Sequence, residues 1–319
     1  LQGLFREYQH HVSVAFMGRT RRALDAAAGF PVAMSCNNGV QAFDAVMQQY
    51  DWFFGELSRS HATPVNLYRT AALAGVLNRL QIVTMPKKGA HSLYDTPGGW
   101  ERHTRQTIAT AYAVGGLCMV PWDVYMPNTM SEDRQRSSTP RYFGEPQDSA
   151  DLFAFIRANA SRLDGYEDAA AVGPGLLDAR WGQEPPVAVH GTEAVYAFVR
   201  VRPDDAEAPV VVHLVDWREA PLPFTLRLRT AAFFADGPAN LALHLPVPYA
   251  AEQHAAATAA AQALRRRDGD APEVLGPRQA AAYAPLSRTL TLDPRPEEAW
   301  TTVEVPALTP WGLLAVRRQ

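Results

Sequence analysis

The sequence predicts an α/β protein whose first half is built from parallel βα units and whose second half is an antiparallel β-sandwich. Two observations carry this prediction. Before Pro185-Pro186, helix-like segments alternate with short, continuously apolar runs, as in parallel sheets covered by helices. After that point, short segments follow one another in which apolar and polar residues alternate, as in sandwiches. A chain of 319 residues suits two domains, which we place at 1–180 and 186–319.

The helices of the first half have recognisable ends. Apolar residues recur at helical spacing through the first segment, and Gly29 follows it as a stop signal. Pro64 suits the first position of a second helix. The cluster that starts at Asp148 is expected to cap the last helix of this half. Helices are therefore expected over 2–28, from Pro64, over 100–114 and from Asp148 to Leu163.

Four apolar runs between these helices are expected to be parallel strands that are neighbours in chain order. They cover 30–36, 51–56, 81–85 and 117–122. Each run ends in a polar or Gly/Pro cluster, where α/β folds keep their sites. A closed barrel of such units needs eight. Four units therefore predict an open sheet edge and an exposed apolar inner face, and with them a chain that associates with itself.

The second half contains seven candidate strands, several of which alternate apolar and polar residues. They are 194–201, 209–217, 224–229, 241–245, 289–292, 301–305 and 312–316. The Ala-rich stretch 250–267 interrupts them, and it is interpreted as a helical insertion or a flexible excursion. Its closing run of three arginines is typical of a solvated helix end.

Composition excludes several classes of function. A formal net charge of -3 gives no sign of a nucleic acid or an anionic membrane as partner. No apolar run reaches the ~18 residues of a membrane span. The nine histidines show no HxH or HExxH spacing, so neither a metal nor a cofactor is expected. Cys36 and Cys118 sit in apolar runs and are expected to be buried free thiols.

The first residues contain no recognisable targeting signal. They lack the basic start and apolar centre of a signal peptide, and they lack an initiator Met. We therefore expect the true N-terminus to lie upstream. Localisation stays open, with secretion and the periplasm included.

Five short segments of the chain, taken in their order, form a pattern that can be compared with known folds. They read Phe5-Arg6-Glu7-Tyr8-Gln9, Val32-Ala33-Met34-Ser35-Cys36-Asn37-Asn38, Tyr50-Asp51-Trp52, Val120-Pro121-Trp122-Asp123-Val124-Tyr125 and Val210-Val211-Val212-His213-Leu214-Val215-Asp216-Trp217. This order resembles the end of barrel glycosidases, especially β-galactosidases that carry a C-terminal β-sandwich. The resemblance spans most of the chain and consists of architecture and short patterns.

The resemblance implies the last four units of a (β/α)8 TIM barrel followed by a sandwich, and an oligo- or polysaccharide substrate. It does not supply the catalytic pair. That clan carries an acid/base Glu after the fourth strand, which would lie before Leu1. The nucleophile Glu follows the seventh strand, whose counterpart here, 83–88, contains no carboxylate. Either the family differs or the site has degenerated.

Two carboxylates remain as catalytic candidates, because glycoside hydrolysis needs a pair across the scissile bond. Glu56 and Asp123 both stand at expected carboxyl ends of strands. The apolar strand before Glu56 would raise its pKa and suit an acid. The alternative for Glu56 is a structural ion pair with Arg59 or Arg69. Asp51 lies at the opposite, stabilising end of its strand and ranks lower.

Other residues near the strand ends are candidates for binding sugar. Amide groups suit sugar hydroxyls, lysine suits an anionic sugar or a carboxylate, and aromatic rings stack on the C–H faces of sugars. The candidates are Asn37, Asn38, Lys87, Tyr94, Trp122 and Tyr125. The alternatives are a plain turn for the asparagines, solvated loop lysines and core packing of the rings. Core packing is favoured for Trp100, and local hydrogen bonding for His91 and His103.

Three functions stay open at this point. The first is a barrel glycosidase. The second is a non-catalytic carbohydrate-binding or scaffold protein on a degenerate barrel. The third is a partial gene product whose missing N-terminal strands supply half of the active site.

Overall fold

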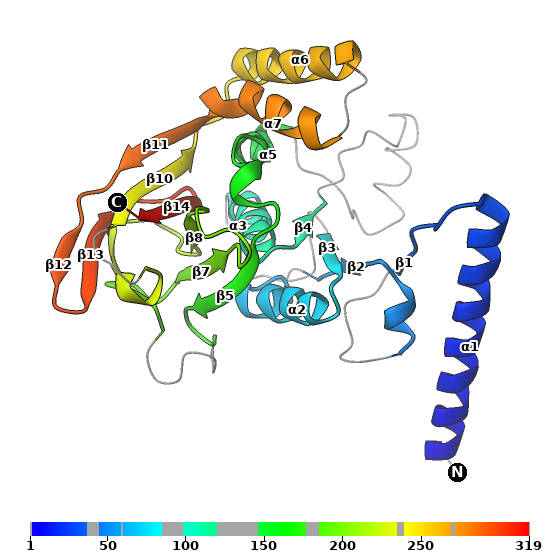
Figure 1. Ribbon diagram of the computed structural model, residues 1–319. Coiled ribbons are helices and arrows are strands. Elements are labelled where there is room, and N and C mark those ends of the chain that lie inside the picture. The colour runs from blue at the N-terminus through cyan, green and yellow to red at the C-terminus, as the bar shows by residue number, and fades with distance from the viewer. Residues whose placement is uncertain are drawn as a thin grey trace.

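The computed structural model describes residues 2–36, 45–58, 60–84, 98–119, 146–176, 185–234, 239–268 and 272–318. Figure 1 shows a small parallel sheet at one side of the chain and a pair of antiparallel sheets at the other, with helices between them. The α/β organisation and the change to antiparallel sheets in the second half are confirmed.

The parallel sheet has the predicted strand order. It contains β1 (Ser35–Cys36), β2 (Trp52–Glu56), β3 (Leu80–Thr84) and β4 (Leu117–Cys118), all paired in parallel and in this order. The outer two strands are shorter than expected. The described strands form an open sheet with β1 and β4 at its edges, and they do not close into a barrel.

The helices of the first half are α1 (Gln2–Ala28), α2 (Pro64–Val76), α3 (Gly99–Ala113) and α5 (Pro146–Ala158). Pro64 begins α2 as predicted, and the Thr63 hydroxyl caps this helix by accepting a bond from the backbone N–H of Asn66. The prediction for α5 was wrong in detail. The helix begins two residues earlier, so Asp148 lies in its first turn, and it ends at Ala158.

The two faces of the parallel sheet differ. Phe53, Val83 and Cys118 are buried in apolar clusters with residues of α2 and α3. Because side chains alternate along a strand, Glu56 and Thr84 point to the opposite face. The other side chains of that face are partly in contact with solvent. Leu80 is 38% exposed, and Trp52, Phe54 and Ile82 are half-buried.

The second half forms the predicted sandwich of two antiparallel sheets. The six-stranded sheet runs in the order β11 (Ser287–Thr291), β10 (Ala239–Pro246), β14 (Trp311–Arg318), β8 (Val210–Asp216), β7 (Val195–Val201), β5 (Glu167–Val172). The four-stranded sheet runs β12 (Arg295–Glu297), β13 (Trp300–Val305), β9 (Phe224–Leu228), β6 (Val187–His190). Apolar side chains from both sheets meet in one core cluster.

The sandwich begins earlier than the boundary placed between 180 and 186. β5 covers Glu167–Val172 and pairs antiparallel with β7, so it belongs to the sandwich. Its sequence, Glu-Asp-Ala-Ala-Ala-Val, holds one β-branched residue and no aromatic residue, so it does not have the composition by which strands are recognised. β12 also went unpredicted, because all three of its residues are exposed and none is apolar except Pro296.

One strand explains how the two halves join. All seven residues of β8 are buried. Val212 and Leu214 face the other sheet of the sandwich, while Val211 and Val215 share a cluster with residues of α3 and α5. A strand covered on both faces reads as a continuous apolar run, which is the pattern found here. The helices and the sandwich therefore share one core.

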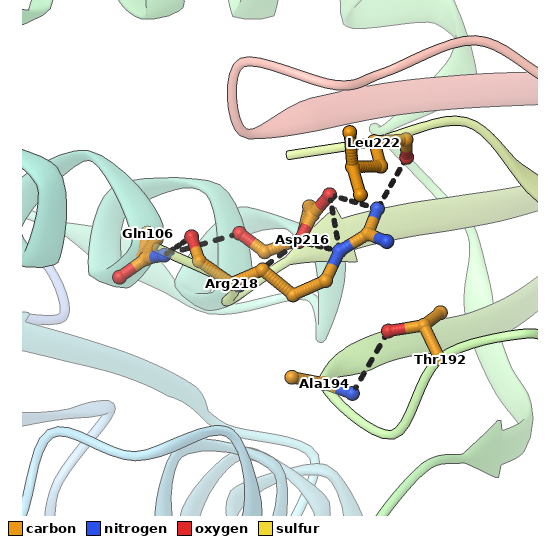
Figure 2. Close-up of polar contacts among 6 residues, drawn as sticks. All are labelled: Gln106, Thr192, Ala194, Asp216, Arg218 and Leu222. Carbon is orange, nitrogen blue, oxygen red and sulfur yellow. Dashed lines mark hydrogen bonds and ion pairs between the residues drawn. The ribbon is translucent and has the colours of Figure 1, made fainter. Parts of the chain in front are cut away.

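Polar contacts also cross this junction (Figure 2). The Gln106 side chain of α3 donates to the backbone carbonyls of Asp216, at 3.2 Å, and Arg218, at 3.5 Å. The buried Asp216 carboxylate accepts from the Arg218 guanidinium at 2.6 Å and from its backbone N–H at 2.9 Å. The charge of Asp216 is thus matched where it is fully removed from water.

The Ala-rich stretch is helical, as predicted. It forms α6 (Ala251–Asp268), and α7 (Pro272–Tyr283) follows it between β10 and β11. In Figure 1 the two helices lie together over α5. Short 3-10 turns complete the described elements at Met47–Gln49, Ala160–Arg162, Thr230–Ala232 and Ala284–Leu286. None of the described helices has the length and hydropathy of a bilayer-spanning segment.

Both cysteines are free thiols, but their settings differ. Cys118 is buried as predicted, and burial raises the pKa of its thiol to about 12. Cys36 is only half-buried, because β1 is the edge strand of its sheet.

Candidate active site at the carboxyl edge of the parallel sheet

The strand register brings the carboxyl ends of the parallel strands to one edge. Glu56 of β2 is paired with Thr84 of β3, and Val83 of β3 is paired with Cys118 of β4. Backbone bonds extend this alignment one residue further, because the N–H of Leu57 donates to the carbonyl of Thr84 at 2.8 Å. The predicted gathering of strand ends is therefore present.

Glu56 is the last residue of β2 and is exposed. Its apolar strand predicts a buried carboxyl group, and that expectation was wrong. The reason is alternation: Phe53 points into the helical layer, whereas Glu56 points to the other face at the point where the strand ends. The side chain of Glu56 is thus in contact with solvent at this edge of the sheet.

Thr84 is the neighbour of Glu56 in the sheet and was not among the predicted site residues. It is 3% exposed, and its hydroxyl has no hydrogen-bond partner among the residues that the structure describes. A buried hydroxyl without a partner is costly. The sequence did not indicate Thr84 as a site residue, because threonine is common in strands for its β-propensity alone.

The loop after β2 adds a second set of groups that the sequence analysis missed. The Ser58 hydroxyl lies 2.6 Å from Nδ1 of His61 and 3.0 Å from the Ser60 hydroxyl, and all three side chains are exposed or half-buried. The cluster begins two residues after Glu56 in the chain. A Ser-x-Ser-His run at the carboxyl end of an expected strand is a signal that could have identified it.

This loop is held in place from several sides. The backbone N–H groups of His61 and Ala62 donate to the carbonyl of Ser58, which closes a tight turn. Nε2 of His103, a fully buried residue of α3, lies 3.1 Å from the carbonyl of Ala62. The prediction that His103 is a local hydrogen-bonder is confirmed. The ring also stands edge-on to Trp217, with centroids 5.5 Å apart.

Asp51 lies at the opposite end of β2 and has a structural partner. Its carboxylate accepts from the Arg21 guanidinium at 2.9 and 3.0 Å and from the backbone N–H of Met34 at 2.8 Å. The hydrogen bond from Arg21 lowers the pKa of Asp51. These contacts attach α1 to the sheet, which agrees with the low rank of Asp51 as a site residue. Trp100 is buried, as predicted.

The other predicted site residues lie outside the described residues. They are Asp123, Asn37, Asn38, Lys87, Tyr94, Trp122 and Tyr125. His91 and Lys88 lie outside them as well. Glu56 is therefore the one predicted site residue whose setting the structure gives.

Metal-ligating side chains do not gather in the described part of the chain, where no group of three or more His, Cys, Asp or Glu residues could hold an ion. Comparisons with known proteins add no family: no family model matches the chain, and no curated protein matches it.

Proposed function

We propose that the protein is a carbohydrate-active hydrolase that cleaves glycosidic bonds at the carboxyl edge of β1–β4. The observation that carries the proposal is the position of Glu56. It ends a parallel strand, is exposed, and lies on the face of the sheet opposite α2 and α3. In a (β/α) barrel that face is the interior, and the carboxyl end is the mouth where catalytic residues stand.

The chemistry assigned to Glu56 is proton transfer. A carboxylic acid beside the scissile bond protonates the leaving oxygen, and a second carboxylate attacks carbon or activates water. We propose Asp123 as that second group. β3 separates β2 from β4, and neighbouring strands lie ~4.8 Å apart. The carboxyl ends of β2 and β4 are thus on the order of 10 Å apart. We propose that Asp123, five residues after the end of β4, completes a pair with the ~6.5–9.5 Å carboxyl separation of an inverting enzyme.

Nearby groups suit the recognition of sugar hydroxyls. The Thr84 hydroxyl is buried without a hydrogen-bond partner among the described residues. A substrate hydroxyl that reached it would supply the missing hydrogen bond and remove the energetic cost of leaving it unmade. Ser58 and His61 offer further donors and acceptors in the loop that follows Glu56. The proposed sugar-binding residues Asn37, Asn38, Lys87, Tyr94, Trp122 and Tyr125 belong to the segments that follow the strands.

The barrel itself is part of the proposal. β1 has an unpaired edge among the described strands, and Leu80 exposes apolar surface on the face opposite the helices. Four further βα units would pair that edge and cover that face. The sandwich packed behind α3 and α5 supports the same reading, because the resembling glycosidases carry a sandwich after the barrel.

A second function is carbohydrate binding without catalysis. It is favoured by the segment 83–88, where the resembling enzymes carry a nucleophile and this chain has no carboxylate. Sugar binding without turnover would identify it.

The test is a screen of aryl glycosides with the protein expressed from its complete gene. Release of the aryl alcohol from at least one glycoside is the expected result, and the anomer formed first, read by NMR, would establish the stereochemical course. If no aryl glycoside is hydrolysed but the protein binds a polysaccharide in a gel-shift assay, the second function is favoured. Neither turnover nor binding would overturn both.

A further inference from the structure

A pocket lies between α5, α6 and α7, on the helical insertion of the sandwich. Its volume is about 420 Å³, within the range of small-molecule sites. Its polar lining comes from Arg157, Thr258, Gln262, Gln279 and Tyr283. Alanines of α6, of α7 and of the 3-10 turn after α5 supply apolar surface. The parallel sheet contributes nothing to the described lining, so the pocket is separate from the edge at Glu56.

The cation of the pocket belongs to the exposed Arg157, and it is oriented by Tyr283. Nη1 of Arg157 donates to the Tyr283 hydroxyl at 2.7 Å, and the guanidinium carbon lies 5.0 Å from the centre of that ring. Tyr283 is itself buried, and its hydroxyl lies 3.4 Å from the Thr258 hydroxyl. A planar guanidinium fixed through one nitrogen keeps its other N–H groups together, which suits the two oxygens of a carboxylate.

The charge of Arg157 has no carboxylate counterpart among the described residues, within ion-pair distance. The other groups of the pocket are neutral. Gln279 uses its amide nitrogen on the carbonyl of Ala261, so its amide oxygen remains as an acceptor. Gln262 is exposed at the pocket and can both donate and accept. The lining therefore combines one cation with several groups that match hydroxyls.

From this geometry we infer that the pocket binds a small hydroxylated carboxylate, such as a uronic acid or a hydroxy acid. The carboxylate pairs with Arg157, and the hydroxyl groups bond to Gln262, Gln279 and Thr258. A neutral sugar would give the Arg157 cation no negatively charged partner, and a bare inorganic anion would leave the amides unused. The inference is independent of the proposed glycosidase activity, because it uses none of the residues assigned to that activity.

Calorimetric titration at low salt with glucuronate, glucose and inorganic phosphate tests this inference. The unmodified protein should bind glucuronate saturably at one site, and glucose and phosphate severalfold more weakly. Arg157→Gln should weaken glucuronate binding about threefold to fivefold, because Arg157 is exposed and solvent screens its charge. Arg295→Gln, an exposed position on β12, makes the same charge change away from the pocket and should bind like the unmodified protein.

A second variant separates the pocket from a general charge effect. Gln262→Ala removes an exposed lining amide without changing charge, and it should weaken glucuronate binding severalfold while thermal unfolding stays the same. No saturable binding of glucuronate, equal binding of glucose or phosphate, or wild-type binding by both Arg157→Gln and Gln262→Ala would overturn the inference.

Discussion

Glu56 and Thr84 lie side by side in parallel register at the carboxyl ends of β2 and β3, on the face of the sheet opposite α2 and α3. One is an exposed carboxylate, and the other is a buried hydroxyl with no hydrogen-bond partner in the described chain. A buried hydroxyl without a partner lowers the stability of the fold. In Thr84 that hydroxyl stands next to the carboxylate to which we assign proton transfer.

The first prediction concerns the ion pair that joins α3 to α5. Arg105 contacts the Asp151 carboxylate through two bonds of 2.7 and 2.6 Å, and the Asp151 side chain is 8% exposed. Asp151→Ala should lower the free energy of unfolding by about 3 kcal/mol, because it leaves a mostly buried guanidinium without its charge partner. Urea unfolding measures the change.

The matched control is Glu219→Ala. Glu219 pairs with Arg102, also of α3, at a similar distance of 2.9 Å, but its side chain is 77% exposed. Solvent screens such a pair, so the loss should stay within about 0.5 kcal/mol. Equal losses for the two variants would contradict the importance assigned to the Arg105–Asp151 pair.

The second prediction is a loss of stability in mild acid. Burial lowers the pKa of His213 well below its usual value, with a smaller effect from Arg200, and burial lowers the pKa of His244 to about 4. The unfolded chain takes up these protons near pH 6.5, whereas the folded chain does not. Stability is thus fully present above about pH 6.5 and falls as the pH drops below it.

His244 alone should account for about 2 kcal/mol of lost unfolding free energy between pH 8 and pH 5. Urea unfolding at both pH values tests this, and His213→Leu should reduce the loss because it removes a protonation site that appears only on unfolding. His190→Gln, at an exposed position, is the control and should keep the original pH dependence. A stability that does not change from pH 8 to pH 5 would contradict the prediction.

The third prediction concerns α1. Five apolar side chains lie exposed along one stripe of this helix at spacings of three and four residues: Leu4, Phe5, Tyr8, Val12 and Phe16. The helix attaches to the rest of the chain near its other end, where Arg21 contacts Asp51, and in Figure 1 it extends away from the sheets. An exposed stripe of this kind predicts self-association.

Sedimentation velocity should show association of the 319-residue chain that rises with concentration. Phe16→Glu should reduce it strongly, because it places a charge within the stripe. Ser13→Glu introduces the same charge on another side of α1 and should leave association unchanged. A monodisperse monomer at high concentration would show that the stripe is not a contact surface.

The order of the parallel strands could be predicted because each strand is a short apolar run between helices. That pattern survives without tertiary information, as 51–56 and 81–85 show in β2 and β3. β5 and β12 could not be predicted in this way. One is rich in alanine and the other is fully exposed, so both owe their extended form to the strand beside them.

The candidate site was harder to predict than the fold. Alternation places Glu56 on the face away from α2 and α3, but the apolar strand before it suggested a buried group. Which face is buried depends on the helices that cover it, and that is a tertiary fact. The position of Thr84 beside Glu56 depends on the register of β2 and β3, which the sequence does not give. Ser58 and His61 could have been found from their Ser-x-Ser-His run, but their contact depends on the turn after β2.

The central claim is that Glu56 acts on a glycosidic bond, and turnover of the best aryl glycoside by Glu56→Gln tests it most directly. Urea unfolding of Glu56→Gln separates a loss of activity from a loss of folding. It should lower kcat by about 10²–10⁴-fold, the usual contribution of a general acid, and Glu252→Gln, at an exposed position on α6, should keep full activity. Turnover by Glu56→Gln equal to that of the unmodified protein would contradict the claim.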